Sequence, residues 1–184
     1  MKYRLLGKTR YLVSEIGLGC WQLGGDFGPL AEDSASAILQ SATDCDINFW
    51  DTADVYGAGE SERRIGQFPH KPANLLVATK VGRGPELYPD GYSLAAVRAS
   101  LEASAQRLGV DTIDLAQLHC VPPEILKQGD IFHWMEELQQ NGLIQHYGAS
   151  VETIEEAFTC LENPGLGTLQ IIFNLFRQDA TEAL

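Results

Sequence analysis

The sequence predicts an α/β fold of the parallel (β/α)8 barrel type, and three observations lead to it. From residue 15 onward, short apolar runs rich in β-formers alternate with longer helix-period segments, as in successive βα units around a parallel sheet. Three consecutive strand-like runs end in an ionisable side chain, at Asp51, Lys80 and His119, and chemistry in such barrels is found at the carboxyl ends of the strands. A doubly wound sheet is the rival architecture, but the stretch "GLGCWQLGG" lacks the G-x-G-x-x-G spacing expected after its first strand.

The expected strands follow one another in chain order. A small N-terminal hairpin comes first, with arms "YRLL" (3–6) and "YLVS" (11–14) and a turn at Gly7. Six strand-like runs come after the hairpin, two fewer than a closed barrel needs. These runs cover residues 15–20, 47–51, 75–80, 113–119, 143–150 and 167–175.

The helical segments lie between these runs and repeat apolar residues with a period typical of amphipathic helices. Asp33 is a plausible N-cap for the first of them, because its side chain can accept hydrogen bonds from the free amides of the first turn. Gly109 is expected to end the longest one. The predicted helices cover residues 32–46, 61–68, 93–108, 131–140 and 152–162.

Composition and charge narrow the class of protein. The formal net charge is −12 and the 13 Lys and Arg residues form no basic cluster, which argues against a nucleic-acid binder. No stretch of 18 apolar residues and no apolar leader is present, so we expect neither a membrane span nor a signal peptide, and we predict a cytoplasmic location. The four cysteines are scattered without a C-x-x-C pair, so neither a zinc cage nor a disulfide framework is expected.

The length of the chain conflicts with a closed barrel. A (β/α)8 barrel takes about 250 residues, whereas this chain has 184 and ends just after its sixth predicted strand. We therefore expect one incomplete barrel domain over residues 1–184, which is either a piece of a longer enzyme or is completed by a partner. The edge of the sixth strand, "LQIIFNLF", is apolar and is a candidate surface for self-association.

Four stretches of the chain carry a family resemblance. They are "NFWDTADVYGAGESERRIG", "LLVATKVG", "SLEASAQRLGVDTIDLAQLH", and "LIQHYGAS" followed by "LQIIFN". In this order they resemble the Asp-to-Tyr signature, the lysine strand, the helix-to-histidine signature and the nicotinamide-binding stretch of the aldo-keto reductases. The resemblance implies an oxidoreductase that uses NADPH, with NADH left open, to reduce a small-molecule carbonyl. The implied roles are catalytic for Asp51, Tyr56, Lys80 and His119, cofactor-binding for Ser150 and Gln170, and substrate-binding for Trp21.

The residue types suit that chemistry. Adding hydride to a carbonyl leaves negative charge on its oxygen, so a proton donor must lie beside it, and an ordinary phenol with a pKa of about 10 is a weak donor. The Lys80 ammonium beside Tyr56 favours the phenolate, and Asp51 paired with Lys80 keeps that ammonium charged and aimed. His119 can donate to the carbonyl oxygen and orient the substrate. The hydride must come from a cofactor, because no side chain carries one.

Each of these residues also has a structural interpretation. Taken singly, Tyr56 and Lys80 are typical of solvated loops, His119 of a hydrogen-bonded core and Asp51 of a turn or an N-cap. Trp21 suits packing as well as substrate contact. Ser150 could instead cap the helix 152–162, and Gln170 could be an ordinary polar strand residue. His133 and His146 are interpreted as structural or exposed, and no metal site is predicted.

Two departures from the family pattern leave a second function open. Val151 stands where the family often has asparagine after the serine of the nicotinamide site, so one amide contact is lost or replaced. The missing quarter of the barrel would carry the aromatic and basic groups that hold the cofactor in the family. The alternative to a reductase is therefore a non-catalytic binding or regulatory module built on the same scaffold.

Overall fold

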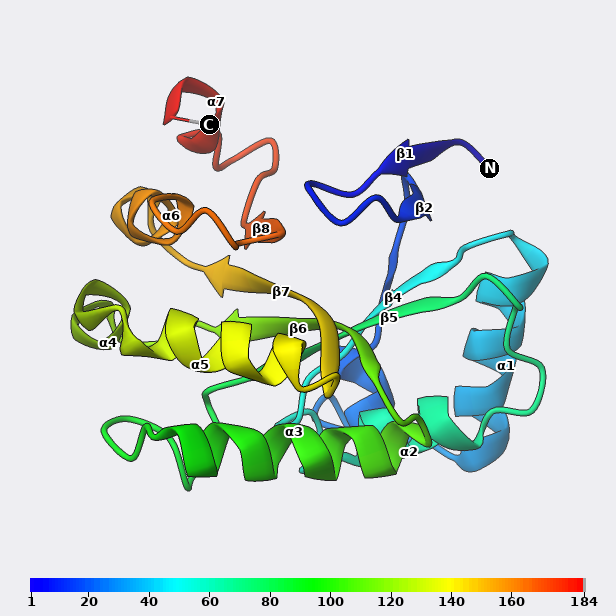
Figure 1. Cartoon of the computed structure of the whole chain (residues 1–184). Coiled ribbons are helices and arrows are strands. Elements are labelled where there is room, and N and C mark those ends of the chain that lie inside the picture. Colours follow the sequence, from blue (N-terminus) through cyan, green and yellow to red (C-terminus); the bar gives the residue numbers. More distant parts are fainter. Residues whose placement is uncertain (184) are drawn as a thin grey trace.

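The computed structural model describes residues 1–183 and is organised around a six-stranded parallel sheet. Neighbouring strands in the sheet are also consecutive in the chain, as in a βα barrel. The sheet curls like one side of a barrel, and the helices lie on its outer side (Figure 1). The predicted number and order of the six strands are confirmed. The strands are β3 (Leu18–Gly19), β4 (Phe49–Asp51), β5 (Leu76–Val81), β6 (Ile113–His119), β7 (Ile144–Val151) and β8 (Thr168–Ile171).

The first and last strands are much shorter than the sequence predicts. The prediction gave 15–20 and 167–175, whereas the structure has Leu18–Gly19 and Thr168–Ile171. Each of these strands has a sheet neighbour on one side only, so fewer backbone hydrogen bonds hold its ends in the ladder. The central strand β6 matches its predicted bounds, 113–119, because it has a partner on each side.

All five predicted helices are present, with bounds shifted by a few residues. In addition, the short 3-10 helix η1 and the helices α4 and α7 are elements that the periodicity did not predict; Pro123 begins α4, where its missing amide proton costs nothing. The helices are η1 (Trp21–Gly24), α1 (Glu32–Asp44), α2 (Glu60–Gln67), α3 (Leu94–Leu108), α4 (Pro123–Gln128), α5 (Asp130–Gln140), α6 (Ile154–Leu161) and α7 (Ala180–Ala183).

Capping confirms one predicted helix end and corrects one predicted start. Gly109 ends α3 in the left-handed conformation, with φ of 70°, as predicted. Asp33 is not the N-cap of α1: Ala31 occupies that position without a side-chain bond, and Asp33 lies inside the first turn. A carboxylate there still stabilises the helix through the partial positive charge of its N-terminus.

A capping box at α6 decides the role that Ser150 could have played there. The Thr153 side chain accepts a hydrogen bond from the Glu156 amide, and the Glu156 carboxylate accepts from the Thr153 amide. The helix start is therefore satisfied without Ser150, which lies in β7. The interpretation of Ser150 as a helix cap is wrong.

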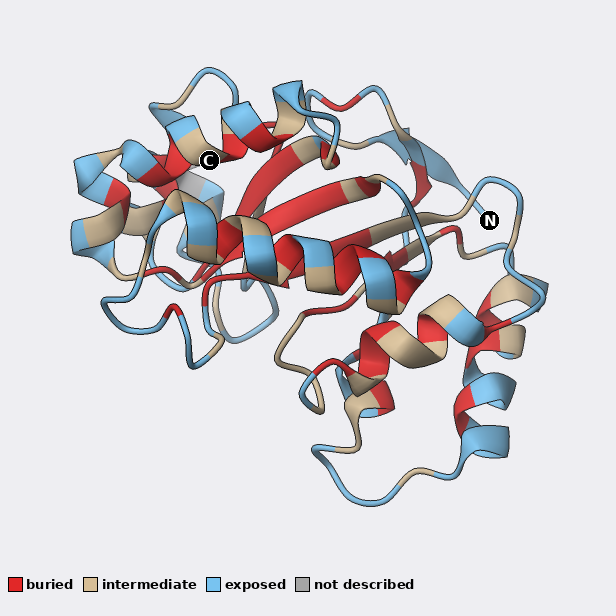
Figure 2. Cartoon of the chain, turned by 60° about the horizontal axis from the view of Figure 1, so that its bottom comes forward, coloured by how far each residue is buried: buried red, intermediate tan, exposed pale blue. Residues whose placement is uncertain are grey.

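The helices bury one face each against the outer side of the sheet. In Figure 2 the inward face of each long helix and most of the central strands are coloured as buried. Two apolar clusters result. One joins α3 to α6 with β5 to β7 and includes Leu101 and Met135, and the other surrounds Trp50 beneath η1, α1 and α2.

The N-terminal hairpin crosses the amino ends of the sheet strands. Its strands β1 (Tyr3–Leu5) and β2 (Leu12–Ser14) are antiparallel, and they are joined by a six-residue loop instead of a tight turn at Gly7. The Lys8 amide donates to the Gly167 carbonyl at 2.8 Å, and Ser14 and Asn48 bond to each other. The carboxyl ends of the strands are left uncovered by the hairpin. None of the described helices has the length and apolar content that crossing a bilayer requires.

Candidate active site

Three ionisable side chains meet at the carboxyl ends of adjacent strands. Asp51 ends β4, Lys80 is the penultimate residue of β5 and His119 ends β6. Tyr56 reaches the same place from the loop after β4, so the proximity expected from the strand ends is present in the structure. The roles of the four residues remain predictions.

Lys80 is the centre of this group. Its side chain is only 3% exposed, and its Nζ donates to Asp51 Oδ2 at 2.7 Å, to the Thr52 carbonyl at 2.9 Å and to the Tyr56 hydroxyl oxygen at 3.1 Å. An ammonium has three N–H groups, so each of them has an acceptor. Burial of the charge is offset by the Asp51 carboxylate, and the Tyr56 oxygen receives a charge-assisted hydrogen bond.

Tyr56 is held from its other side by Trp21. The two rings are stacked, with centroids 5.6 Å apart and planes 20° from parallel, and Trp21 is itself 49% exposed. Asp26 Oδ2 fixes the arrangement by accepting hydrogen bonds from Trp21 Nε1 at 2.9 Å and from the Gly57 amide at 3.1 Å. The exposure of Trp21 indicates that it forms a wall of the open cleft and is not a core residue.

Glycine is required where η1 touches the loop that carries Tyr56. Gly57 has φ of +59°, and a Cβ on it would lie 2.1 Å from the Gly24 carbonyl oxygen. A Cβ on Gly24 would lie 2.6 Å from the Gly57 amide nitrogen. Any side chain at either position would force apart the two segments that stack Trp21 on Tyr56.

His119 is neutral at physiological pH. Burial, and then the nearby charges of Lys80 and Arg83, lower its pKa to about 3. Its ring meets the Tyr56 ring edge to face at 5.9 Å. The buried Nδ1 has no hydrogen-bond partner among the described residues. A neutral imidazole can donate one hydrogen bond and accept another, which suits it to a polar, uncharged ligand group.

A pair of glutamines surrounds the Asp51 carboxylate. Gln117 Nε2 lies 3.3 Å from Asp51 Oδ1 and 3.4 Å from Gln170 Oε1, and Gln170 Nε2 donates to Asp51 Oδ2 at 3.2 Å. Gln170, which was predicted to bind cofactor, is thus also a partner of Asp51. Sequence reasoning missed Gln117, although side chains two residues apart share a strand face, so the inward His119 already implied an inward Gln117.

The side chains of Asp51, Tyr56, Lys80 and His119 line one cleft of about 960 Å³. The predicted residues Ser150, Gln170 and Trp21 are all part of its lining. The lining also includes Arg83, which the sequence analysis did not single out even though it follows the lysine strand directly. Searching every residue after a strand end, and not only the last residue of the strand, would have found it.

Comparison with known proteins gives a consistent result. A family model described as the aldo/keto reductase family matches residues 15–184. Among curated proteins, L-galactose dehydrogenase from Arabidopsis thaliana is 32% identical over 95% of this chain. The chain spans 56%, 60% and 58% of the lengths of the first three such relatives.

Two solved structures support the same fold. The holo form of an aldo-keto reductase from Bacillus halodurans is 31% identical, superposes with a TM-score of 0.81, and the match covers 94% of this chain and 58% of that one. An aldo-keto reductase from Klebsiella pneumoniae, solved in complex with NADPH, is 24% identical with a TM-score of 0.74 over 94% of this chain and 59% of that one, a likeness that shows the fold alone.

Proposed function

The chain belongs to the aldo/keto reductase family, and we propose that it catalyses the reduction of an aldehyde or ketone to an alcohol with a nicotinamide cofactor, NADPH in the first instance. One observation carries this proposal: the ammonium of Lys80 bonds both the Tyr56 hydroxyl, at 3.1 Å, and the Asp51 carboxylate, at 2.7 Å. A buried cation next to a phenol that faces an open cleft is an arrangement for moving a proton.

Tyr56 is the proton donor in this proposal. When negative charge develops on the substrate oxygen, the hydroxyl gives up its proton and the Lys80 ammonium stabilises the phenolate that remains. Asp51 acts through Lys80, because its carboxylate holds the ammonium in place and balances its charge in a buried position. The two glutamines around Asp51 donate one further hydrogen bond to each of its oxygens and so fix the direction of that carboxylate.

His119 orients the substrate. Its imidazole is neutral, so it offers a hydrogen bond to the carbonyl oxygen without adding a second positive charge beside Lys80. The stacked Trp21 forms an apolar wall of the same cleft. We therefore expect small carbonyl compounds with an apolar substituent to be the better substrates.

The residues present fit the nicotinamide end of the cofactor. Ser150 and Gln170 lie opposite each other on adjacent strands. Both line the cleft that also contains the four proposed catalytic residues, and there a hydroxyl and an amide can bond a carboxamide. When bound, the cofactor supplies the hydride, which no protein side chain can provide.

The test separates binding from turnover. NADPH and NADH are titrated into the protein by fluorescence, and reduction of a generic aldehyde is then followed by loss of nicotinamide absorbance. Tighter binding of NADPH together with turnover that requires the Tyr56 hydroxyl supports the proposal. Binding without any turnover over a broad aldehyde and ketone panel would favour the non-catalytic module instead.

A further inference from the structure

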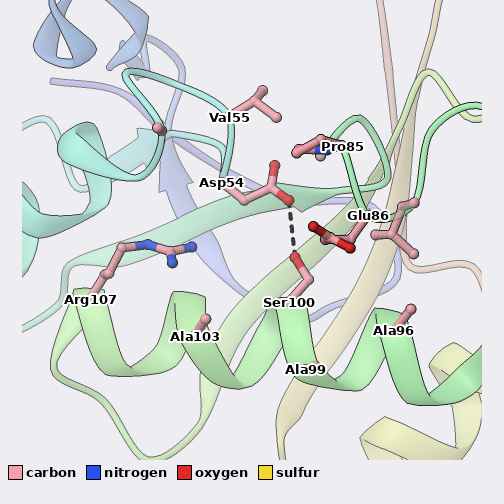
Figure 3. A pocket seen from close by; sticks show the side chains of 12 residues that line it. Asp54, Val55, Pro85, Glu86, Ala96, Ala99, Ser100, Ala103 and Arg107 are labelled. Atoms are coloured by element: carbon pink, nitrogen blue, oxygen red, sulfur yellow. Dashed lines mark hydrogen bonds between the residues drawn. The ribbon is translucent and has the colours of Figure 1, made fainter. Parts of the chain in front are cut away.

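A second cavity lies on the outer side of the loop that carries Tyr56. It has a volume of about 780 Å³ and opens between the loop after β4, the loop after β5 and the helix α3 (Figure 3). It is separate from the catalytic cleft; Val55 is the residue common to both linings. None of the residues given a catalytic role above lines it.

Asp54 supplies an incompletely bonded carboxylate to this cavity. Its Oδ2 accepts a hydrogen bond from Ser100 Oγ at 3.0 Å, while its buried Oδ1 has no partner among the described residues. Burial raises the pKa of Asp54 to about 6, and Glu62 adds to the effect against the opposing influence of Ser100 and Arg107. The side chain is therefore mostly ionised at pH 7 and above.

The charges around the cavity leave a negative excess. Figure 3 shows the carboxylates of Asp54 and Glu86 and the hydroxyl of Ser100 directed toward the same space. Arg107 is the positively charged member of the described lining, but its guanidinium is committed to Glu62, at 2.6 and 2.7 Å, and to Ser104 Oγ at 3.0 Å. Its charge is thus largely balanced outside the cavity, and a ligand that complements the remaining charge is a cation.

The walls of the cavity are apolar. Ala96, Ala99 and Ala103 form the floor along one face of α3, and their methyl groups leave the space above the helix unfilled (Figure 3). Pro85 and Leu87 lie on the opposite loop. A hydrated inorganic cation gains nothing from such walls, and the described residues hold no group of three His, Cys, Asp or Glu side chains arranged for a metal ion. An organic body would bury apolar surface against them.

We propose that this cavity is a second ligand site, which binds a small organic ammonium compound whose cationic group bonds Asp54 and whose apolar body lies on the alanine face of α3. Recognition combines a charge-assisted hydrogen bond to the Asp54 carboxylate, beside the second carboxylate of Glu86, with burial of a ring or short alkyl group. The site is independent of the reductase function, because its residues take no part in the chemistry proposed for the cleft.

The experiment is a direct binding measurement with a matched pair of probes. 1-Naphthylmethylamine and the neutral 1-naphthylmethanol are titrated into the protein by calorimetry at pH 7.5, and amide NMR shifts locate the site. We expect the amine to bind about tenfold or more tightly than the alcohol, the difference that a charged hydrogen bond supplies. Shifts are expected in α3 and in the loop of Asp54.

Variants make the test specific. Asp54→Asn should weaken amine binding about tenfold and leave the alcohol unchanged, whereas Ala103→Leu should fill the cavity and abolish both. Glu102→Gln and Ala95→Leu, at exposed positions of α3 outside the lining, are the matched controls and should bind as the native protein does. Equal affinity for amine and alcohol, or no detectable amine binding, overturns the proposal. If Asp54→Asn does not fold, undiminished amine binding by Ala103→Leu overturns it as well.

Discussion

The Nζ of Lys80 lies 3.1 Å from the hydroxyl oxygen of Tyr56, across 24 residues of chain. One residue belongs to a strand and the other to a loop. The Asp54 amide donates to the Lys80 carbonyl and so ties the loop to β5, and within the loop the Tyr56 amide donates to the Ala53 carbonyl. The contact with Lys80 positions the proposed proton donor, so the first prediction concerns the Tyr56 hydroxyl.

Replacing Tyr56 by Phe should lower kcat by several orders of magnitude while leaving the dissociation constant of NADPH within about twofold. The hydroxyl matters mainly when charge develops on the substrate oxygen, so its loss affects the transition state more than the ground state. Steady-state kinetics with an aldehyde and fluorescence titration of NADPH measure the two quantities. Tyr92→Phe, which removes a hydroxyl outside the cleft, is the control. A Tyr56→Phe protein with native kcat would remove Tyr56 from the acid role.

Replacing Lys80 by Met should abolish turnover and destabilise the fold by about 3 kcal/mol. The variant leaves the Asp51 carboxylate, whose side chain is 18% exposed, without its counter-ion. Urea unfolding measures the loss. The double variant Lys80→Met with Asp51→Leu should recover part of it, because the uncompensated charge is then gone. If adding Asp51→Leu to Lys80→Met costs as much stability as Asp51→Leu costs in the native protein, the two side chains are not coupled.

Asp54 should make the protein less stable as the pH rises. Its pKa in the folded state, about 6, is above the ordinary value of 3.8, so the folded state binds the proton more tightly. The resulting stabilisation is complete below about pH 4 and is lost as the pH rises through about 6. The free energy of unfolding of Asp54→Asn, relative to the native protein, should therefore increase from pH 4.5 to pH 7. Asp90→Asn, at an exposed position, serves as the control, and a constant difference for Asp54→Asn would contradict the expectation.

His119 should make the protein less stable as the pH falls. Its pKa falls from 6.5 to about 3 in the folded state, so the unfolded chain binds the proton more readily. The stabilisation is complete above about pH 6.5 and is lost as the pH falls toward 3. His119→Gln should thus gain stability relative to the native protein between pH 7 and pH 4.5. His133→Gln, with a side chain that is 76% exposed, should show no such trend. If the free energies of unfolding of the two variants, relative to the native protein, change with pH in the same way, burial of His119 does not make the protein less stable at low pH.

The segment 172–176 should promote self-association. Leu175 is 87% exposed and Phe176 is 99% exposed, and they follow the edge strand β8. We expect sedimentation velocity to detect concentration-dependent oligomers of the native protein, and fewer of them in the variant Leu175→Ser with Phe176→Ser. The variant Phe158→Ser with Leu161→Ser, at partly exposed positions of α6, is the matched control and should not have this effect. A strictly monomeric native protein would contradict the prediction.

Local signals in the sequence determined the order of the strands and the position of the candidate site. Apolar runs and helix periods are properties of neighbouring residues, so the alternation that predicts six parallel strands can be read without knowing any distant contact. The same holds for Asp51, Lys80 and His119, because a charge directly after an apolar run marks the carboxyl end of a strand. The bounds of β6 were predicted to the residue, and a partner strand on each side supports its full length.

Only the tertiary structure decided which groups bond one another. Gln117 and Gln170 reach Asp51 from positions 66 and 119 residues away, and Ser100 reaches Asp54 only once α3 packs behind the loop of Asp54. The lengths of β3 and β8 were likewise set by pairing and not by apolar content, since an edge strand extends only as far as its one neighbour supports it. The sequence by itself therefore determined the kind of fold and the proposed catalytic residues, whereas the hydrogen-bond partners and the second cavity depend on contacts between distant segments, which arise only when the sheet curls and its helices pack.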